Sequence, residues 1–289
     1  MHTIGFIGTG VMGNAMAGHL IDAGYNLVVF NRTASKADNL VARGAQRVDT
    51  PAEVAQNCDV VITMVGYPAD VREVYLGDAG LIANARAGAL LIDMTTSSPA
   101  LAQEIARVAS EAGVSAIDAP VSGGDVGAKN ATLTIMVGGE KEDFERALPL
   151  FEVMGSSYTL HGCAGCGQHC KMANQINIAA TMIGMAESLA YAKKAGLNPM
   201  AVINTLSGGS SQTWSLSNYG PRVLKDDFAP GFYVKHFIKD LRIALEQAED
   251  MGLALPGTEL AKELYERLSN EGCQDFGTQA IMKLYSGDN

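Results

Sequence analysis

Two polar side chains, an amine and an amide, stand at the start of a long apolar helical pattern. Lys171 opens a run that reads as one helix as far as Ala195, and Asn174 follows three residues later, on the same face. Burial disfavours a charged ammonium, so a buried lysine would have its pKa lowered from about 10.4 towards neutrality. Such a lysine can exchange a proton with a substrate. The alternative is an amine that reaches solvent at the end of its stem.

A glycine-rich segment earlier in the chain is a candidate anion site. Ser122, Gly123 and Gly124 end the sequence DAPVSGG, which follows a strand-like run. The glycines leave backbone N–H groups bare beside a hydroxyl, and such a loop can cradle a carboxylate. Composition alone favours the other interpretation, an ordinary glycine-rich turn.

A third segment has the pattern of a dinucleotide-binding turn. The segment Gly8–Gly13 fits G-x-G-x-x-G, follows the strand-like run Thr3–Ile7 and opens a helical pattern. In that setting Gly8 permits the tight turn, Gly10 lets a pyrophosphate approach, and Gly13 lets helix and strand pack closely. The helix start supplies N–H groups for the phosphates. Without a ligand, the segment would be a plain glycine-rich turn.

The end of the second predicted strand, Leu27–Phe30, indicates which dinucleotide binds. Enzymes that use NAD usually carry Asp or Glu there to bind the ribose hydroxyls. This chain has Asn31, Arg32 and Thr33, so no carboxylate would repel a 2′-phosphate and a guanidinium is placed to hold one. The pattern favours NADP. NAD stays the alternative, with Arg32 as a solvated side chain stacked on adenine.

The elements that would position these residues fall into two halves. Strand-like and helical patterns alternate in the first half, which predicts an α/β Rossmann domain with a mostly parallel, doubly wound sheet. Its other strand-like runs are Val60–Val65, Ala89–Ile92, Ser115–Ile117 and Leu133–Val137. From about Gly165 only helical patterns follow. We therefore expect a cofactor domain at 1–163 and an all-helical domain at 164–289, beginning with a long interdomain helix.

Composition and charge exclude several classes of protein. The 289 residues suit two domains, and 47% hydrophobic with 18% charged residues is typical of globular proteins. A net charge of −10 argues against nucleic acid or an anionic membrane as a partner. Neither a signal peptide nor a membrane span is expected. The five cysteines, an odd number, fit reduced thiols in the cytoplasm better than a disulfide framework.

A group of histidines and cysteines before the long helix raises the question of a metal site. Its members are His161, Cys163, Cys166, His169 and Cys170. A structural zinc site needs four convergent ligands, and nothing in the spacing requires that arrangement. We predict no metal, and interpret these residues as the small and polar side chains of a glycine-rich loop.

Together these segments resemble the β-hydroxyacid dehydrogenase family, which includes 3-hydroxyisobutyrate dehydrogenase, tartronate semialdehyde (2-hydroxy-3-oxopropionate) reductase and the glyoxylate/succinic semialdehyde reductases. The resemblance covers the whole chain and is carried, in order, by GFIGTGVMG, DAPVSGG, GCGQHCKMANQ and KHFIKDL. It implies a Rossmann domain followed by a helical domain. It also implies an NAD(P)-dependent oxidoreductase that moves a hydride between nicotinamide and a small 3-hydroxy acid or its semialdehyde.

The resemblance also implies roles for single residues. Lys171 would be the catalytic acid/base, which protonates the alkoxide after hydride transfer. Ser122, Gly123 and Gly124 would bind the substrate carboxylate, and Asn174 would hydrogen-bond the substrate near Lys171. The imine reductases share this architecture but replace the catalytic lysine, so the presence of Lys171 argues against that class.

Further residues would hold the cofactor. Thr96 would contact the nicotinamide ribose, Val65 would line the cofactor groove, and Lys239 would reach the cofactor site from the helical domain, with Asp240 beside it as a structural residue. The predicted cofactor-binding residues are Gly8, Thr9, Gly10, Val11, Met12, Gly13, Asn31, Arg32, Thr33, Val65, Thr96 and Lys239.

Two departures from the family pattern leave the substrate open. Gln175 stands where many members have a second Asn, and Gly66-Tyr67-Pro68 stands where many have Leu-Pro. 3-Hydroxyisobutyrate is the first candidate, followed by tartronate semialdehyde, succinic semialdehyde and glyoxylate. A remote alternative is a cofactor-binding interaction protein without catalysis, against which Lys171 argues. The apolar long helix further predicts a homodimer or homotetramer.

Overall fold

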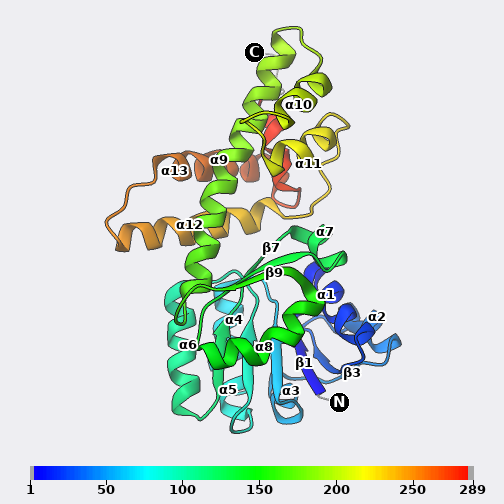
Figure 1. The fold of residues 1–289 in the computed structure, drawn as a ribbon, viewed down its shortest axis with the longest axis vertical. Helices are drawn as coiled ribbons and strands as arrows, with labels where there is room; N and C mark the ends of the chain where they lie inside the picture. Colours follow the sequence, from blue (N-terminus) through cyan, green and yellow to red (C-terminus); the bar gives the residue numbers. More distant parts are fainter. Residues whose placement is uncertain (1–2, 286–289) are drawn as a thin grey trace. The chain divides into compact units, whose positions relative to one another are not determined.

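The computed structural model describes residues 3–285, and the chain divides into two compact units, Met1–Lys171 and Met172–Asn289. The first unit alternates strands and helices and the second is helical (Figure 1), which confirms the predicted fold class. The predicted boundary after residue 163 falls in the loop before the long helix α9 and stays a prediction. No helix within residues 3–285 has the length and hydrophobicity to span a membrane.

The first unit is built on a six-stranded parallel sheet with strand order β3-β2-β1-β4-β5-β6. This is the doubly wound order of dinucleotide-binding domains. The strands are β1 (Thr3–Ile7), β2 (Asn26–Phe30), β3 (Gln46–Arg47), β4 (Val60–Thr63), β5 (Leu90–Asp93) and β6 (Ser115–Asp118). Our sequence prediction missed β3, because two exposed polar residues carry no strand pattern.

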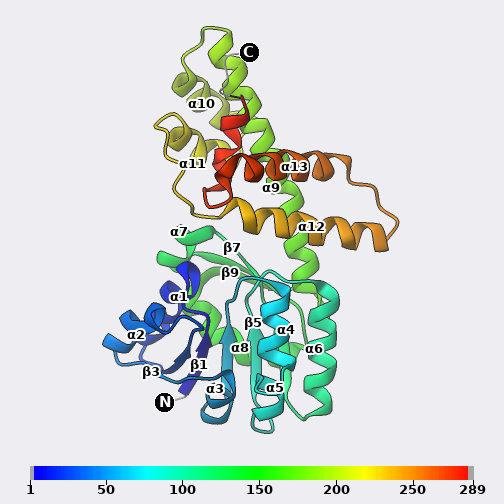
Figure 2. The same ribbon diagram turned by 180° about the vertical axis from the view of Figure 1, so that it is seen from behind.

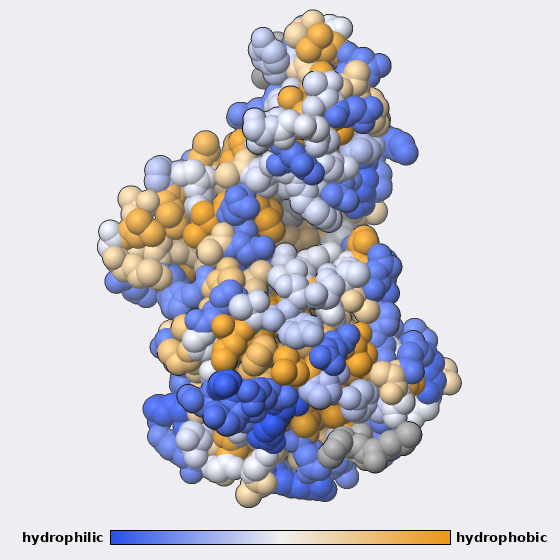
Figure 3. All heavy atoms as spheres, in the orientation of Figure 1, coloured by the Kyte–Doolittle hydropathy of each residue, from blue (hydrophilic) through white to orange (hydrophobic). Residues whose placement is uncertain are grey.

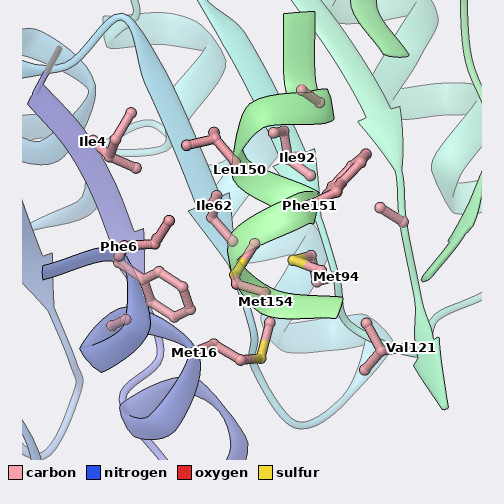
Figure 4. Close-up of a cluster of buried hydrophobic side chains, with 14 of the residues drawn as sticks. Ile4, Phe6, Met16, Ile62, Ile92, Met94, Val121, Leu150, Phe151 and Met154 are labelled. Atoms are coloured by element: carbon pink, nitrogen blue, oxygen red, sulfur yellow. The ribbon is translucent and has the colours of Figure 1, made fainter. Parts of the chain in front are cut away.

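Helices cover both faces of this sheet, as Figures 1 and 2 show from opposite sides. Successive strand residues point to opposite faces, so Phe6 packs in one core and Ile7 in the other. Figure 4 shows Ile4 and Phe6 on the face shared with Met16 and Phe151. That face is covered by α1 (Val11–Asp22) and α8 (Lys141–Met154), and the other by α3 (Pro51–Asn57), α4 (Pro68–Leu76), α5 (Leu81–Asn84) and α6 (Pro99–Glu111). The short η1 (Ala34–Ala37) and α2 (Asp38–Ala42) join β2 to β3.

A second, three-stranded sheet in the same unit has the order β7-β8-β9. It consists of β7 (Val121–Ser122), β8 (Leu133–Val137) and β9 (Gly155–Leu160), with α7 (Gly124–Lys129) between the first two strands. β7 is antiparallel to β8, and β8 is parallel to β9. The predicted strand at β8 is confirmed. Its neighbours are short or polar and were not predicted.

The second unit is a helical bundle, which confirms the predicted helical half. Its core holds the buried Met182 and Met185 together with Phe237 and Tyr265, whose rings meet edge to face with centroids 4.9 Å apart. Its elements are α9 (Cys166–Lys194), α10 (Pro199–Ser207), α11 (Trp214–Val223), α12 (Val234–Asp250), α13 (Pro256–Leu268), η2 (Ser269–Cys273) and η3 (Thr278–Tyr285). α9 begins in the first unit, at Cys166 rather than at the predicted Lys171.

Candidate active site

The glycine-rich turn joins β1 to α1. An added Cβ would lie 2.1 Å from the Met64 carbonyl oxygen at Gly8, and 1.9 Å from the Gly8 carbonyl oxygen at Gly13. Packing therefore requires both glycines. At Gly10, by contrast, none of the described atoms lies within 4 Å of the added Cβ. The backbone at Gly10 is thus open to a ligand, and α1 starts there without a side-chain cap, which suits a pyrophosphate.

Thr9 and Asn31 hold this turn against the end of β2. The buried Thr9 donates its N–H to Asn31 Oδ1 at 2.9 Å, and Asn31 Nδ2 donates to the Thr33 carbonyl at 2.8 Å. Both ends of the Asn31 amide are therefore used within the protein, so this side chain braces the turn. Val11 and Met12 form the first turn of α1, and the Val11 side chain is half exposed.

Arg32 lies beside this turn with a side chain that is 85% exposed. Its guanidinium contacts Asp70 Oδ1 at 3.1 Å, in the first turn of α4. Exposed ion pairs contribute little, with a median of about 0–1 kcal/mol. The guanidinium can therefore exchange this carboxylate for a phosphate oxygen at small cost.

The carboxyl ends of β4 and β5 bring two more predicted cofactor residues to the same sheet edge. Val65 follows β4 and donates its N–H to Thr95 Oγ1 at 3.0 Å, while the half-buried Thr96 follows in the loop after β5. β1 and β4 are neighbours in the sheet, and the strand order reverses between them. Such a switch point is where open α/β sheets bind ligands.

Lys171 is buried, with only 6% of its surface exposed. Its Nζ donates to the Val121 carbonyl at 2.8 Å. Val121 directly precedes Ser122, and Gly123 and Gly124 follow with φ of +129° and +62°, which glycine tolerates. The amine is therefore bonded to β7, the strand that carries the predicted carboxylate loop, and does not reach solvent.

Asp118, at the end of β6, anchors the start of α9. Its two carboxylate oxygens accept the backbone N–H groups of Gly165 at 2.7 Å and Gln168 at 2.8 Å. This capping by a distant carboxylate explains why α9 begins before Lys171. Burial raises the pKa of Asp118 to about 6, against the two backbone hydrogen bonds, and nearby Asp93 adds to the rise.

Four polar side chains are linked in the second unit. Asn174 Nδ2 donates to Gln175 Oε1 at 2.7 Å, and Gln175 Nε2 donates to Asp240 Oδ2 at 2.6 Å. Lys239 Nζ lies 2.9 Å from Asp240 Oδ1, and the carboxylate is buried. The predicted Asn174 and Lys239 thus belong to one hydrogen-bonded group, joined by Gln175 and Asp240.

The histidine and cysteine group does not form a metal site in the part of the chain that the structure describes. Among residues 3–285, no three His, Cys, Asp or Glu side chains are arranged to hold a metal ion. Cys163 and Cys166 are free thiols whose sulfurs lie 3.9 Å apart.

Three of these buried residues were missed as site residues by sequence reasoning. Gln168 and Gln175 lie three residues before and four after Lys171, a spacing that places all three on one helix face. Asp118 opens the same DAPVSGG segment as Ser122. The signal was therefore present, as polar residues at helical spacing around the lysine.

Comparison with known proteins covers both units. Residues 3–165 match the family described as the NAD-binding domain of 6-phosphogluconate dehydrogenase. Residues 165–285 match the family described as NAD-binding of NADP-dependent 3-hydroxyisobutyrate dehydrogenase.

The relatives match over nearly the full chain. An uncharacterised oxidoreductase of Bacillus subtilis is 56% identical over 98% of both chains. A probable mitochondrial 3-hydroxyisobutyrate dehydrogenase-like protein of Arabidopsis thaliana is 52% identical, over 96% of this chain and 84% of its own. The 2-hydroxy-3-oxopropionate reductase of Escherichia coli is 39% identical, over 97% and 96%. Among solved structures, Mycobacterium tuberculosis 3-hydroxyisobutyrate dehydrogenase with L-serine has a TM-score of 0.90 and 31% identity, over 99% of this chain and 100% of its own.

Proposed function

Because this chain belongs to the β-hydroxyacid dehydrogenase family and is an NAD(P)-dependent oxidoreductase, we propose that it interconverts a small 3-hydroxy acid and its semialdehyde, with 3-hydroxyisobutyrate as the first candidate. The observation that carries this proposal is the buried amine of Lys171, bonded to the strand that presents Ser122, Gly123 and Gly124. A buried proton donor beside an anion-binding loop suits a substrate that has both a carboxylate and a reacting oxygen.

In this proposal the chain's residues position the substrate and move the proton. The bound nicotinamide supplies or accepts the hydride. Ser122 Oγ and the N–H groups of Gly123 and Gly124 bind the carboxylate. Lys171 gives a proton to the alkoxide oxygen in reduction and takes it back in oxidation, while Asn174 hydrogen-bonds the substrate near it. Lys171 moves between charged and neutral forms, which an arginine cannot do.

We propose NADP as the preferred cofactor, with NAD as the alternative. The pyrophosphate would lie on the open backbone at Gly10, and the 2′-phosphate on Arg32 and Thr33. Asn31 would act by bracing the turn through Thr9. Val65, Thr96 and Lys239 would complete the cofactor site, together with the remaining residues of the glycine-rich turn.

The alternative substrates are tartronate semialdehyde, succinic semialdehyde and glyoxylate. The Escherichia coli relative is named for 2-hydroxy-3-oxopropionate. The Mycobacterium structure is of a 3-hydroxyisobutyrate dehydrogenase with L-serine. 3-Hydroxyisobutyrate and L-serine are both carboxylates with a hydroxyl on carbon 3. That shared chemistry supports a 3-hydroxy acid, with the group on carbon 2 as the variable.

We further propose a homodimer or homotetramer joined through the helical half, 164–289. Exposed apolar side chains gather where α12 and α13 are connected (Figure 3), among them Met251, Leu253 and Leu260. Large exposed apolar patches mark interaction sites. The free thiols among the described residues suit the reducing cytoplasm as the working compartment.

The test is a panel of 3-hydroxy acids and semialdehydes, assayed with NADP and NAD and ranked by kcat/KM. We expect the highest kcat/KM for a 3-hydroxy acid, and a preference for NADP of at least about tenfold, which corresponds to about 1.4 kcal/mol. A wild type that turns over none of the panel would refute the proposed reaction. A tenfold preference for NAD would refute the proposed cofactor alone.

A further inference from the structure

Gln168 is a fully buried glutamine in the first turn of α9, and all of its described contacts lie in the first unit. Its Oε1 accepts the Ser97 N–H at 2.9 Å and its Nε2 donates to the Thr95 carbonyl at 2.8 Å. These two backbone groups flank Thr96. The side chain therefore pairs with the loop as one strand pairs with another, across 71 and 73 residues of sequence.

We propose that Gln168 is a positioning residue that sets where Lys171 stands relative to the loop of Thr96. This rests on the proposed function, in which Lys171 carries the proton and Thr96 contacts the nicotinamide ribose. Lys171 lies three residues after Gln168, one helical turn on and on the same face. A rigid helix turn transmits the position of one side chain to the other. Gln168 thereby fixes the distance between Lys171, which carries the proton, and the loop of Thr96, which contacts the cofactor.

The amide is chemically specific for this task. Only a side chain with one donor and one acceptor can satisfy both the Ser97 N–H and the Thr95 carbonyl. A glutamate of the same shape offers an acceptor at both ends, so it faces the Thr95 carbonyl with a repelling oxygen unless it is protonated. Methionine fills the same volume with neither a donor nor a strong acceptor.

The start of α9 is also bonded to β6 and β7. Asp118 Oδ2 accepts the Gln168 N–H at 2.8 Å, and Lys171 Nζ donates to the Val121 carbonyl at 2.8 Å. Loss of the Gln168 side-chain bonds therefore leaves α9 attached to β6 and β7 but released from the loop of Thr96. Loss of these bonds should therefore lower kcat and the affinity for the cofactor, while the affinity for the substrate carboxylate stays nearly unchanged.

The experiment compares Gln168→Glu with wild type in kcat, in KM for the best acid and in the dissociation constant of the cofactor. At pH 8 we expect kcat to fall about 100-fold, the effect of an ångström-scale misplacement. The cofactor should bind more weakly, and KM for the acid should change little. As pH falls, the introduced carboxyl takes up a proton and donates to the Thr95 carbonyl again, so kcat should recover. Asp93 and Asp118 favour that protonation, and Lys171 opposes it.

Two controls keep the result interpretable. Gln56→Glu adds the same charge at an exposed position of α3 and should match the wild-type pH profile. Gln168→Met should lose kcat at every pH, without recovery at low pH, and it provides the measurement if Gln168→Glu does not fold. The proposal is overturned if folded variants keep wild-type kcat and cofactor affinity, or if Gln168→Glu shows no recovery relative to Gln168→Met. Failure of the proposed function would appear separately, as a wild type without turnover; cofactor affinity can still be measured in that case.

Discussion

Two buried glutamines on α9 stand on either side of Lys171 and bind opposite kinds of partner. Gln168 binds backbone groups of Thr95 and Ser97, which every sequence with this fold supplies. Gln175 binds the side chains of Asn174 and Asp240, which a sequence can change. We therefore expect the turn before Lys171 to determine stability and the position of α9, and the turn after it to affect substrate binding under the proposed function.

The direction of the hydrogen bonds strengthens this distinction. An ionised carboxylate only accepts, so Asp240 requires the nitrogen of Gln175 to face it. The oxygen of Gln175 then faces Asn174, whose nitrogen must point back towards it. Asp240, beside the ammonium of Lys239, therefore fixes which way round the Asn174 amide lies. This ordering depends on Gln175, at the position where the sequence departs from the family pattern.

The largest expected effect is on stability, and its absence would contradict the distinction between the two glutamines. Gln168→Leu should lower the free energy of unfolding by about 4 kcal/mol, because two buried backbone groups each lose a partner at about 1–3 kcal/mol. Gln175→Leu should cost about half as much, because Asn174 can rotate and Asp240 keeps Lys239. Urea denaturation of the two matched variants measures both. Equal losses would show that backbone and side-chain partners do not differ here.

The second prediction concerns Asp118, which serves the architectural side. Its pKa is raised from 3.8 to about 6 in the folded chain. Between these pH values the native state binds the proton and the unfolded state does not, so this group's contribution to stability falls as pH rises from about 4 to about 6. The loss amounts to about 3 kcal/mol at 1.36 kcal/mol per pH unit.

Asp118→Asn removes that titration. Urea denaturation from pH 4 to 7 should show the wild type losing stability relative to Asp118→Asn as pH rises, with the difference constant above about pH 6.5. A difference that is flat over the whole range, or one that grows in favour of the wild type, would contradict the raised pKa.

The smallest expected effect concerns cofactor choice and extends the comparison to β2. Asn31, like Gln168, uses its amide on backbone groups, and we therefore propose that Arg32 distinguishes the cofactors. Arg32→Ala should lower the ratio of kcat/KM for NADP over NAD by at least about tenfold, or 1.4 kcal/mol. Arg107→Ala, an exposed arginine on α6, is the matched control and should leave the ratio unchanged. An unchanged ratio in Arg32→Ala would show that other residues set the preference between NADP and NAD.

The sequence was informative where structure depends on local pattern. The apolar runs at β1, β4, β5 and β8 predicted strands, and the glycine spacing predicted the turn before α1. The two-residue strands and the polar β9 carry no such pattern. The sequence does not say which distant residues meet in space. It therefore could not predict that Asp118 caps α9 from 47 residues away, or that Lys171 bonds the Val121 carbonyl across 50 residues. Both facts depend on tertiary packing.

The most direct test of the account is the turnover of Lys171→Ala on the best substrate of the panel. A positioned proton donor typically contributes about 10²–10⁴-fold to the rate, so kcat should fall by at least that much while the variant stays folded and binds the cofactor. Lys171→Arg should fail nearly as badly, because a guanidinium does not release its proton near neutral pH. Circular dichroism and fluorescence quenching by the cofactor provide the controls. A folded, cofactor-binding Lys171→Ala that keeps more than about a tenth of wild-type kcat would contradict the assignment of the proton to Lys171.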